Sequence, residues 1–293
     1  MIRSMTGFGS FEGSDEICIQ HWEIKSVNSK SLNVRFKIPS YLRPLEHIWL
    51  KEVKKFATRG NIDIYLNIKI LSTDQLPFSI NETFLNLMFD YVDKYAKTRG
   101  EIFVPDYNRV LSMPNLWVET PISTEAKLVS SLEKGLKHAL ESWNGFRMRE
   151  GTKLVQDLID RIGRLNEIKH RITNLSKSIV QEKFNTFRSR ILELLKDLNV
   201  QLSEERLLQE LSIMADRLDI SEELVRLNTH LEAIYGLLTS KKVVGRPLDF
   251  LLQECFREIN TLGNKAQNAQ ISGLVVEFKT ELEKCREQVQ NLE

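Results

Sequence analysis

Alternating apolar and polar positions in the first part of the chain predict β-strands. The pattern is clearest at residues 31–38, where every second residue is apolar, the period of a half-buried strand (Leu32, Val34, Phe36 and Ile38). Three similar runs and two amphipathic runs complete this part: strands are expected at 1–11, 16–27 and 62–70, and helices at 44–56 and 81–97. The order βββαβα favours a compact α+β domain, with one four-stranded sheet backed by two helices.

Proline placement separates this part from the rest. Six of the seven prolines lie in the first 121 residues and the next is Pro247, so the stretch between them can form long helices. Leucine and isoleucine recur every three or four residues through 152–198, which indicates a helical arm. We therefore expect an α+β fold in three parts: a mixed α/β sheet domain at 1–123, the arm at 124–202, and an all-α domain at 203–293.

Composition is that of a globular chain. The 293 residues are 42% hydrophobic and 28% charged, which excludes a disordered or fibrous protein and suggests about two domains. Three scattered cysteines are too few for a disulfide framework or a metal knuckle. Neither a membrane-length apolar run nor a signal-peptide pattern is present. The sequence thus predicts a cytoplasmic protein with no membrane partner.

Charge is balanced overall but unevenly placed. Lys and Arg number 41 and Asp and Glu number 40, which excludes a general polycation. Residues 1–60 carry ten basic against six acidic side chains, residues 145–200 carry twelve against seven, and residues 201–260 carry seven against eleven. Phosphate-binding surfaces beside a carboxylate cluster would give this pattern, and so would ordinary solvated helix faces.

Several common catalytic motifs are missing. GFGSFEG at 7–13 has one residue too many between its last two glycines for a dinucleotide loop, and GxxxxGK[ST], GxSxG and HExxH do not occur. Chemistry that depends on NAD, on ATP or on a standard zinc site is therefore disfavoured.

The densest polar region, 246–268, has the pattern of an amphipathic helix with two polar ridges. At 100° per residue, one ridge holds four residues (Gln253, Arg257, Asn260 and Asn264) and the next holds four more (Glu254, Glu258, Thr261 and Lys265). Glu254 and Glu258, one turn apart, can share a hard cation, and Arg257 and Lys265 can contact phosphate. The alternative is a charged outer face stabilised by ion pairs.

A second expected helix, 216–238, repeats this arrangement. One stripe carries three acids, a base and a histidine (Asp216, Asp219, Glu223, Arg226 and His230). It suits a metal site or an acid–base pair. Acids that complement the dipole at a helix start, with a structural histidine, would give the same stripe.

Two basic turns are further candidates. Lys25, Asn28 and Lys30 surround an expected turn, and Arg147 and Arg149 flank a glycine-punctuated bend. Short polar and basic side chains in such places can hold phosphate. Plain hairpin chemistry and an exposed helix end are the alternatives.

At these residues the sequence resembles the YicC-like endoribonuclease family of bacteria. The resemblance covers nearly the whole chain, in order, through SMTGFG (4–9), EIKSVNSKSLNVRFKIP (23–39), RGNI (59–62), RMREG (147–151), ADRLDISEELVRLNTHLE (215–232), GRPLDFLLQECFREINTLGNKA (245–266) and the final EKCREQVQNLE. It departs at Lys30, where the family commonly has arginine, so a bidentate phosphate contact is lost there.

The resemblance implies an N-terminal α+β domain, a helical arm, a C-terminal helical domain, a ring-like homohexamer and metal-assisted RNA cleavage in RNA turnover. Its site falls on the C-terminal part. Catalytic roles are expected for Glu254, Arg257, Glu258 and His230, and Mn²⁺ or Mg²⁺ ligation for Glu254, Glu258, Asp219 and Glu223. RNA contacts are expected from nine residues: Lys25, Asn28, Lys30, Arg59, Arg147, Arg149, Arg226, Asn260 and Lys265.

Three function classes are consistent with these residues. The first is a divalent-metal-assisted endoribonuclease that hydrolyses phosphodiester bonds of single-stranded or structured RNA. A variant uses the RNA 2′-hydroxyl as nucleophile with His230 as base and no metal, leaving 2′,3′-cyclic phosphate ends. The others are a non-catalytic RNA-binding adaptor and a structural oligomer whose polar faces are subunit contacts.

Overall fold

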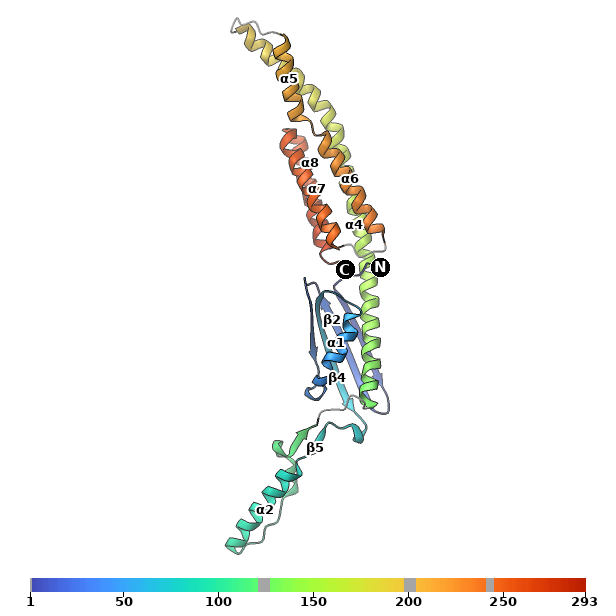
Figure 1. Ribbon diagram of the computed structural model, residues 1–293, viewed down its shortest axis with the longest axis vertical. Coiled ribbons are helices and arrows are strands. Elements are labelled where there is room, and N and C mark those ends of the chain that lie inside the picture. The colour runs from blue at the N-terminus through green and yellow to red at the C-terminus, as the bar shows by residue number, and fades with distance from the viewer. Residues whose placement is uncertain (1, 121–126, 198–203, 241–244) are drawn as a thin grey trace. The chain divides into compact units, whose positions relative to one another are not determined.

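The chain forms two compact units. The computed structural model describes residues 2–120, 127–197, 204–240 and 245–293 (Figure 1). One unit comprises residues 6–146, and the other comprises residues 1–5 with 147–293. Both boundaries expected from the sequence, at 123/124 and 202/203, lie outside the described residues. The three-part division therefore stays a prediction.

The 6–146 unit is built on the expected four-stranded sheet. Its strands are β1 (Gly7–Ser14), β2 (Cys18–Val27), β3 (Leu32–Lys37) and β4 (Gly60–Ile70), in the order β1-β2-β4-β3. β3 runs parallel to β4 and the other neighbours are antiparallel. The parallel pair is joined through η1 (Ser40–Leu45) and α1 (Glu46–Lys54), because parallel strands need a crossover connection. The predicted βββαβ order is confirmed.

One helix that covers this sheet differs from the expectation. Buried Trp22 and Ile64 of the sheet share a core with Trp49 of α1 and with Leu136 and Trp143 of α4 (Lys127–Asp197). The second expected helix forms as α2 (Glu82–Arg99) but supplies no described residue to that core. It is followed by α3 (Tyr107–Leu111) and accompanied by a two-stranded sheet of β5 (Phe78–Ile80) and β6 (Trp117–Glu119), with η2 (Thr73–Gln75) and η3 (Pro114–Leu116).

The first residues of the chain do not belong to this sheet. A strand was expected over 1–11, but β1 begins at Gly7. Ser4 instead forms a β-bridge with Leu292, and the amide of Met5 donates to the carbonyl of Asn291 at 2.8 Å. A sequence pattern can show that a segment is extended, but it cannot show which segment it pairs with. The residues before Gly7 pair with the C-terminal residues and not with the sheet.

The other unit is helical. It contains α5 (Glu204–Leu218), α6 (Ser221–Thr239), α7 (Gly245–Ala266) and α8 (Ala269–Val289), together with the second half of α4. Apolar side chains of α4, α6, α7 and α8 form one core. α7 and α8 are joined by two residues, and the side chain of Asn268 caps α8 by accepting from the amides of Gln270 and Ile271. Such a short connection makes α7 and α8 antiparallel neighbours.

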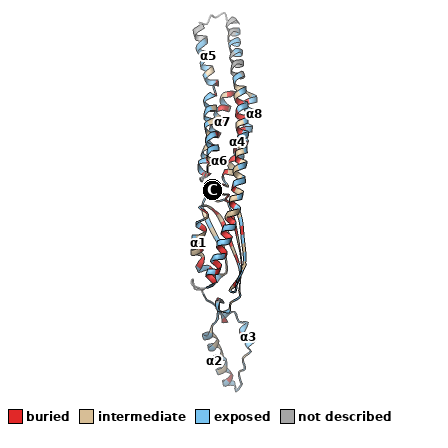
Figure 2. Ribbon diagram, turned by 90° about the vertical axis from the view of Figure 1, so that its right-hand side faces the viewer, coloured by how far each residue is buried: buried red, intermediate tan, exposed pale blue. Residues whose placement is uncertain are grey.

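Burial on these helices follows their amphipathic sequences. Figure 2 shows both buried and exposed residues along each long helix. Among the described residues, no helix is both long enough and apolar enough to cross a membrane.

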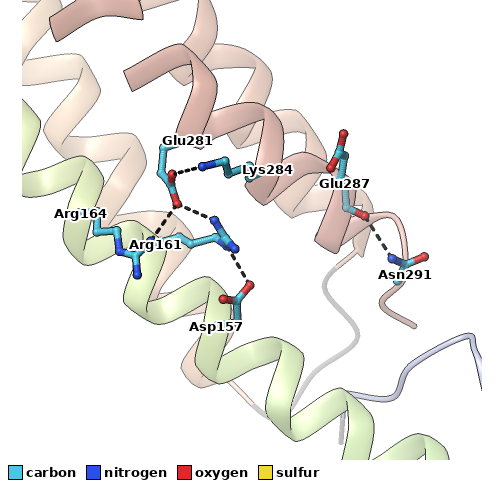
Figure 3. A network of polar contacts seen from close by, with 7 residues as sticks. All are labelled: Asp157, Arg161, Arg164, Glu281, Lys284, Glu287 and Asn291. Carbon is cyan, nitrogen blue, oxygen red and sulfur yellow. Dashed lines mark hydrogen bonds and ion pairs between the residues drawn. The ribbon is translucent and has the colours of Figure 1, made fainter. Parts of the chain in front are cut away.

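A polar network ties α4 to α8 (Figure 3). The carboxylate of Glu281, whose side chain is 10% exposed, accepts from Arg161 at 2.6 Å and from Lys284 at 3.2 Å. Arg161 also bonds Asp157 at 2.8 Å, and Arg164 lies 3.7 Å from Glu281. Burial alone would raise the pKa of Glu281, but the hydrogen bonds from Lys284 and Arg161 outweigh it and hold that pKa below its ordinary 4.5.

This network predicts an acid-sensitive stability. Because the pKa of Glu281 is lowered in the folded state, its contribution is present above about pH 4.5 and is lost as pH falls through the folded pKa. Glu281→Gln is expected to lower the free energy of unfolding by about 2 kcal/mol at pH 7 and to reduce its pH dependence in the acid range. Urea titrations at several pH values measure both effects.

The matched control is Glu277→Gln. Glu277 also pairs with an arginine of α4, at 3.2 Å from Arg171, but both side chains are more than half exposed. Its loss is expected to change stability by less than about 1 kcal/mol. Equal effects of the two substitutions would contradict the role given to Glu281.

Candidate active site

The candidate site lies where α6 packs against α7. Four cross-helix pairs define the register: Glu223 with Lys265, Arg226 with Glu258, and His230 with both Glu254 and Glu258. Residue numbers fall along one helix as they rise along the other, so the helices are antiparallel. The polar stripe of α6 therefore faces the ridge of α7 that carries Glu254, Glu258 and Lys265.

One cluster on this face has the chemistry of a metal site. His230, Glu254 and Glu258 each offer one ligand atom, and these atoms all lie within 4.8 Å of one another. Glu258 is only 6% exposed, and the one ionic contact found for it among the described residues is Arg226 Nη1 at 3.7 Å. A buried carboxylate with so distant a counter-charge is costly. Two carboxylates and an imidazole are a donor set that suits a divalent cation.

About two helical turns from this cluster, on the same α6/α7 face, lies a tight ion pair. Glu223 is 5% exposed, and its Oε1 lies 2.7 Å from Lys265 Nζ. This hydrogen bond raises the pKa of Lys265, which keeps the ammonium charged. Glu223 Oε2 is buried and has no hydrogen-bond partner in the described structure. Glu223 thus holds the ammonium of Lys265 on the same α6/α7 face as the cluster, and one of its carboxylate oxygens has no partner among the described residues.

Arg226 is the second cation of this face. It pairs with Glu222 on its own helix and reaches toward Glu258 from α6. Its side chain remains 57% exposed, so part of the guanidinium faces solvent. A phosphate that approached the cluster would meet Arg226, whereas Lys265 lies about two turns farther along α7.

Asp219, expected as a ligand, lies outside the His230–Glu254–Glu258 group. The helix predicted over 216–238 is interrupted: α5 ends at Leu218 and α6 begins at Ser221. Asp219 accepts from the amide of Ser221 at 2.9 Å and from its hydroxyl. These hydrogen bonds lower the pKa of Asp219. An aspartate that bonds a backbone amide two residues later favours a turn over a continuous helix.

Arg257 and Asn260 also lie apart from this cluster. They belong to the other ridge of α7 and line a groove of ≈ 430 Å³ between α7 and α8. The sequence grouped them with Glu254 and Glu258 because all four are polar. The structure separates them because α7 has a different helical neighbour on each side.

Arg147 was expected to contact RNA, and its placement argues against that role. It is 1% exposed, its Nε donates to the carbonyl of Ser4 at 2.6 Å, and its guanidinium pairs with Glu293. Burial lowers the pKa of Arg147 although Glu293 opposes this effect. Arg147 fastens the first and last residues of the chain to α4, whereas its neighbour Arg149 is exposed.

The remaining basic candidates belong to the 6–146 unit. Lys25 is exposed, bonds Glu23 at 2.9 Å, and lies over the rings of Phe8 and Tyr65 at 5.7 and 5.4 Å. Asn28 and Lys30 are exposed in the turn between β2 and β3, and Arg59 is half-buried directly before β4. Exposed ammonium groups and aromatic rings are typical of single-stranded nucleic-acid surfaces.

Two polar residues of the helical unit were missed. Lys169 of α4 is buried, which lowers its pKa, and its ammonium donates to Asn166 and to Asn228 of α6. It lies four residues after Leu165 in the apolar stripe of α4, a position that could have singled it out. Arg286 of α8 also lines the α7/α8 groove, and no local pattern marked it.

Comparison with known proteins places the whole chain in one family. The model described as "Endoribonuclease YicC-like, N-terminal region" matches residues 2–156, and "Endoribonuclease YicC-like, C-terminal" matches residues 172–293. A protein of Clostridioides difficile named "Probable endoribonuclease YicC" is 33% identical, and one of the same name from Haemophilus influenzae is 32% identical; both alignments cover each chain completely. The chain belongs to the YicC-like endoribonuclease family.

Proposed function

We propose that this protein is an endoribonuclease that hydrolyses internal phosphodiester bonds of RNA with the help of a divalent metal. The observation that carries the proposal is the convergence of His230 from α6 with Glu254 and Glu258 from α7. The names of the relatives supply the substrate class and the reaction. We further propose that it acts in RNA turnover, as the family resemblance implies, and in the cytoplasm, as expected from its few scattered cysteines.

The donor set fits a divalent cation. Glu254, Glu258 and His230 would hold Mn²⁺ or Mg²⁺, with Glu258 shielded from solvent and Glu254 half-buried beside it. When bound, the ion would lower the pKa of a water and neutralise charge on the scissile phosphate. Carboxylates alone would repel that phosphate, which is why the cluster needs a cation.

The cations of the chain then orient the RNA. Lys265 is held in place and kept protonated by Glu223, so it offers a fixed charge to a phosphate oxygen. Arg226, already shared between Glu222 and Glu258, presents donors that can bind a phosphate at the cluster itself. Cationic side chains that are already oriented before the reaction stabilise the negative charge that develops on the phosphate in the transition state. Water molecules, which must first reorient, do so less well.

The basic and amide side chains at the β2–β3 turn and before β4 suit the RNA backbone. Lys25, Asn28, Lys30 and Arg59, with Arg149 of the helical unit, would contact phosphates without reading sequence. RNA binding through such contacts releases counterions from the phosphates, so the affinity falls as the salt concentration rises.

Removal of one carboxylate tests the proposed centre. In Mn²⁺, Glu258→Gln is expected to reduce the cleavage rate of a structured RNA by about 100-fold or more, since a carboxylate ligand is lost while the volume is kept. EDTA should abolish cleavage by the unmodified protein. Gel assays of the cleaved RNA and calorimetric titration with Mn²⁺ measure the two effects.

Glu277→Gln is the control, because Glu277 is an exposed acid of the same unit. It should cleave at the unmodified rate. Equal cleavage rates for the unmodified protein in Mn²⁺, the unmodified protein in EDTA and Glu258→Gln would contradict the proposed metal centre. Intact RNA binding without cleavage in Mn²⁺ or Mg²⁺ would instead select the adaptor.

The chemistry of the product ends separates the two cleavage routes. Attack by an activated water is expected to leave 5′-phosphate ends. Attack by the 2′-hydroxyl, with His230 as base, would leave 2′,3′-cyclic phosphates without a metal. Mass spectrometry of the fragments decides, and cyclic ends formed in EDTA would contradict the metal-dependent route.

A homo-oligomer is the second part of the proposal, and the resemblance suggests six copies. Its support is the apolar surface of α2 and the residues after it, where Tyr91, Tyr95 and Ile102 are 70%, 63% and 90% exposed. Exposed apolar patches of this kind mark association sites.

Light scattering after gel filtration tests the assembly. The unmodified protein should give a multiple of 34.1 kDa, and Tyr91→Glu with Tyr95→Glu should shift it toward one copy. These side chains are exposed, so the fold should be retained. Tyr235→Glu on α6, also exposed, should leave the mass unchanged. A monomeric unmodified protein would overturn the expectation.

A further inference from the structure

The other polar ridge of α7, which carries Arg257, borders a groove toward α8 that is lined by polar side chains. Gln253, Arg257, Asn260 and Asn264 lie along it, and Glu283 and Arg286 of α8 face them across the ≈ 430 Å³ groove. Phe256, Leu252 and Leu282 supply apolar surface in the same groove. Its volume lies in the range of about 300–1,000 Å³ that small-molecule sites occupy.

Several polar groups of this groove are unused within the chain. No hydrogen bond or ion pair is found for the side chains of Arg257, Asn260 or Asn264 in the part of the chain that the structure describes. Arg286, by contrast, is fixed by Asp249 at 3.3 Å and lies 3.9 Å from Glu283. The groove thus combines one anchored guanidinium with one that is free to bind.

The residue types also disfavour a purely structural explanation. Asparagine and threonine are poor helix formers, yet Asn260, Thr261 and Asn264 lie within the last two turns of α7. Only Thr261 bonds its own helix, through its hydroxyl to the carbonyl of Arg257 at 3.2 Å. Among the described residues, the two amides therefore weaken the helix without a compensating contact.

This combination matches the parts of one nucleotide. A guanidinium binds phosphate oxygens through paired hydrogen bonds. Carboxamides donate to and accept from base edges and the 2′-hydroxyl. An aromatic ring offers a surface for a base to stack on, and Phe256 is half-buried with Lys279 Nζ 5.9 Å from its ring centre.

We propose that the α7/α8 groove binds one unpaired nucleotide of the RNA, next to the nucleotide at the His230–Glu254–Glu258 cluster. The proposal rests on the proposed function for the identity of the ligand. Arg257 and Glu258 are consecutive, so their side chains leave α7 about 100° apart. An RNA strand that crosses α7 would put neighbouring nucleotides on the two ridges. A base inside a duplex could not enter the groove, so the site selects unpaired RNA.

The experiment measures RNA binding without cleavage. Fluorescence anisotropy of a short labelled single-stranded RNA in EDTA, at several salt concentrations, is compared for the full chain and for Arg257→Gln. Loss of the guanidinium is expected to weaken binding about tenfold and to lower the salt slope by about 1. Asn260→Ala should weaken binding by a few fold with an unchanged slope, because it removes no charge.

Two controls isolate the groove. Arg171→Gln removes an exposed positive charge from the same unit, where Arg171 pairs with Glu277, and should leave the affinity unchanged. A duplex of the same sequence should bind Arg257→Gln as it binds the unmodified protein. Calorimetric Mn²⁺ binding by Arg257→Gln should also be unchanged, which shows that the variant is folded.

The outcomes separate this inference from the proposed function. If Arg257→Gln binds single-stranded RNA with the affinity and the salt dependence of the unmodified protein, the nucleotide site is overturned. The groove would then be assigned to a protein partner. An equal loss on single-stranded and duplex RNA also overturns it, because the contact would then be a general phosphate contact. If the protein cleaves no RNA but Arg257→Gln selectively loses single-stranded RNA, the nucleotide site stands and the endoribonuclease proposal fails.

Discussion

The antiparallel packing of α6 on α7 is the constraint on which the candidate site depends. Leu227, Leu231 and Ile234 on one helix and Cys255 and Ile259 on the other belong to the same apolar core. A core of this kind fixes the rotation of each helix about its axis, because turning either one would expose apolar side chains. The polar residues beside the seam have no independent freedom: once the core is packed, His230 must face Glu254 and Glu258.

That constraint explains why two carboxylates are buried at a considerable cost. Glu223 and Glu258 lie next to the seam, where water is scarce, and ionised groups there need counter-charges. Glu223 has one in Lys265 at 2.7 Å, whereas among the described residues Glu258 has only Arg226 at 3.7 Å. The difference argues that the two acids serve different purposes. Glu223 holds the ammonium of Lys265, and Glu258 is the acid of the cluster for which we propose a divalent cation as the counter-charge.

Periodicity was sufficient to predict much of this architecture. The alternation at 31–38 and at 62–70 located β3 and β4, and the 100° projection of 246–268 separated the apolar side of α7 from its two polar ridges. These features are local, because the period of a segment is set by its own backbone geometry. The resemblance to the family, which is a property of the whole chain, supplied the substrate class.

The sequence pattern could not predict which segments and side chains pair with each other. The sequence showed that residues 2–5 were extended but could not show that they pair with 291–293. It showed a basic Arg147 but not that Glu293, the last residue given, pairs with it. Asp219 continued the helical pattern, yet its own side chain bonds Ser221 and interrupts the helix. Each outcome depends on a contact that the local pattern does not contain.

The two ridges of α7 constrain the shape of any ligand that uses both of them. Adjacent ridges of one helix diverge by about 100°, so they can serve one ligand only if that ligand is long enough to bend around the helix. Glu258 lies in the contact with α6 and Arg257 lines the groove toward α8, so a ligand that meets both must reach around α7. A polymer with a charge at each repeat meets both, because successive repeats lie on successive ridges. The division of polar residues between the α6 and α8 sides of α7 is therefore the arrangement that the strand-like substrate proposed above requires.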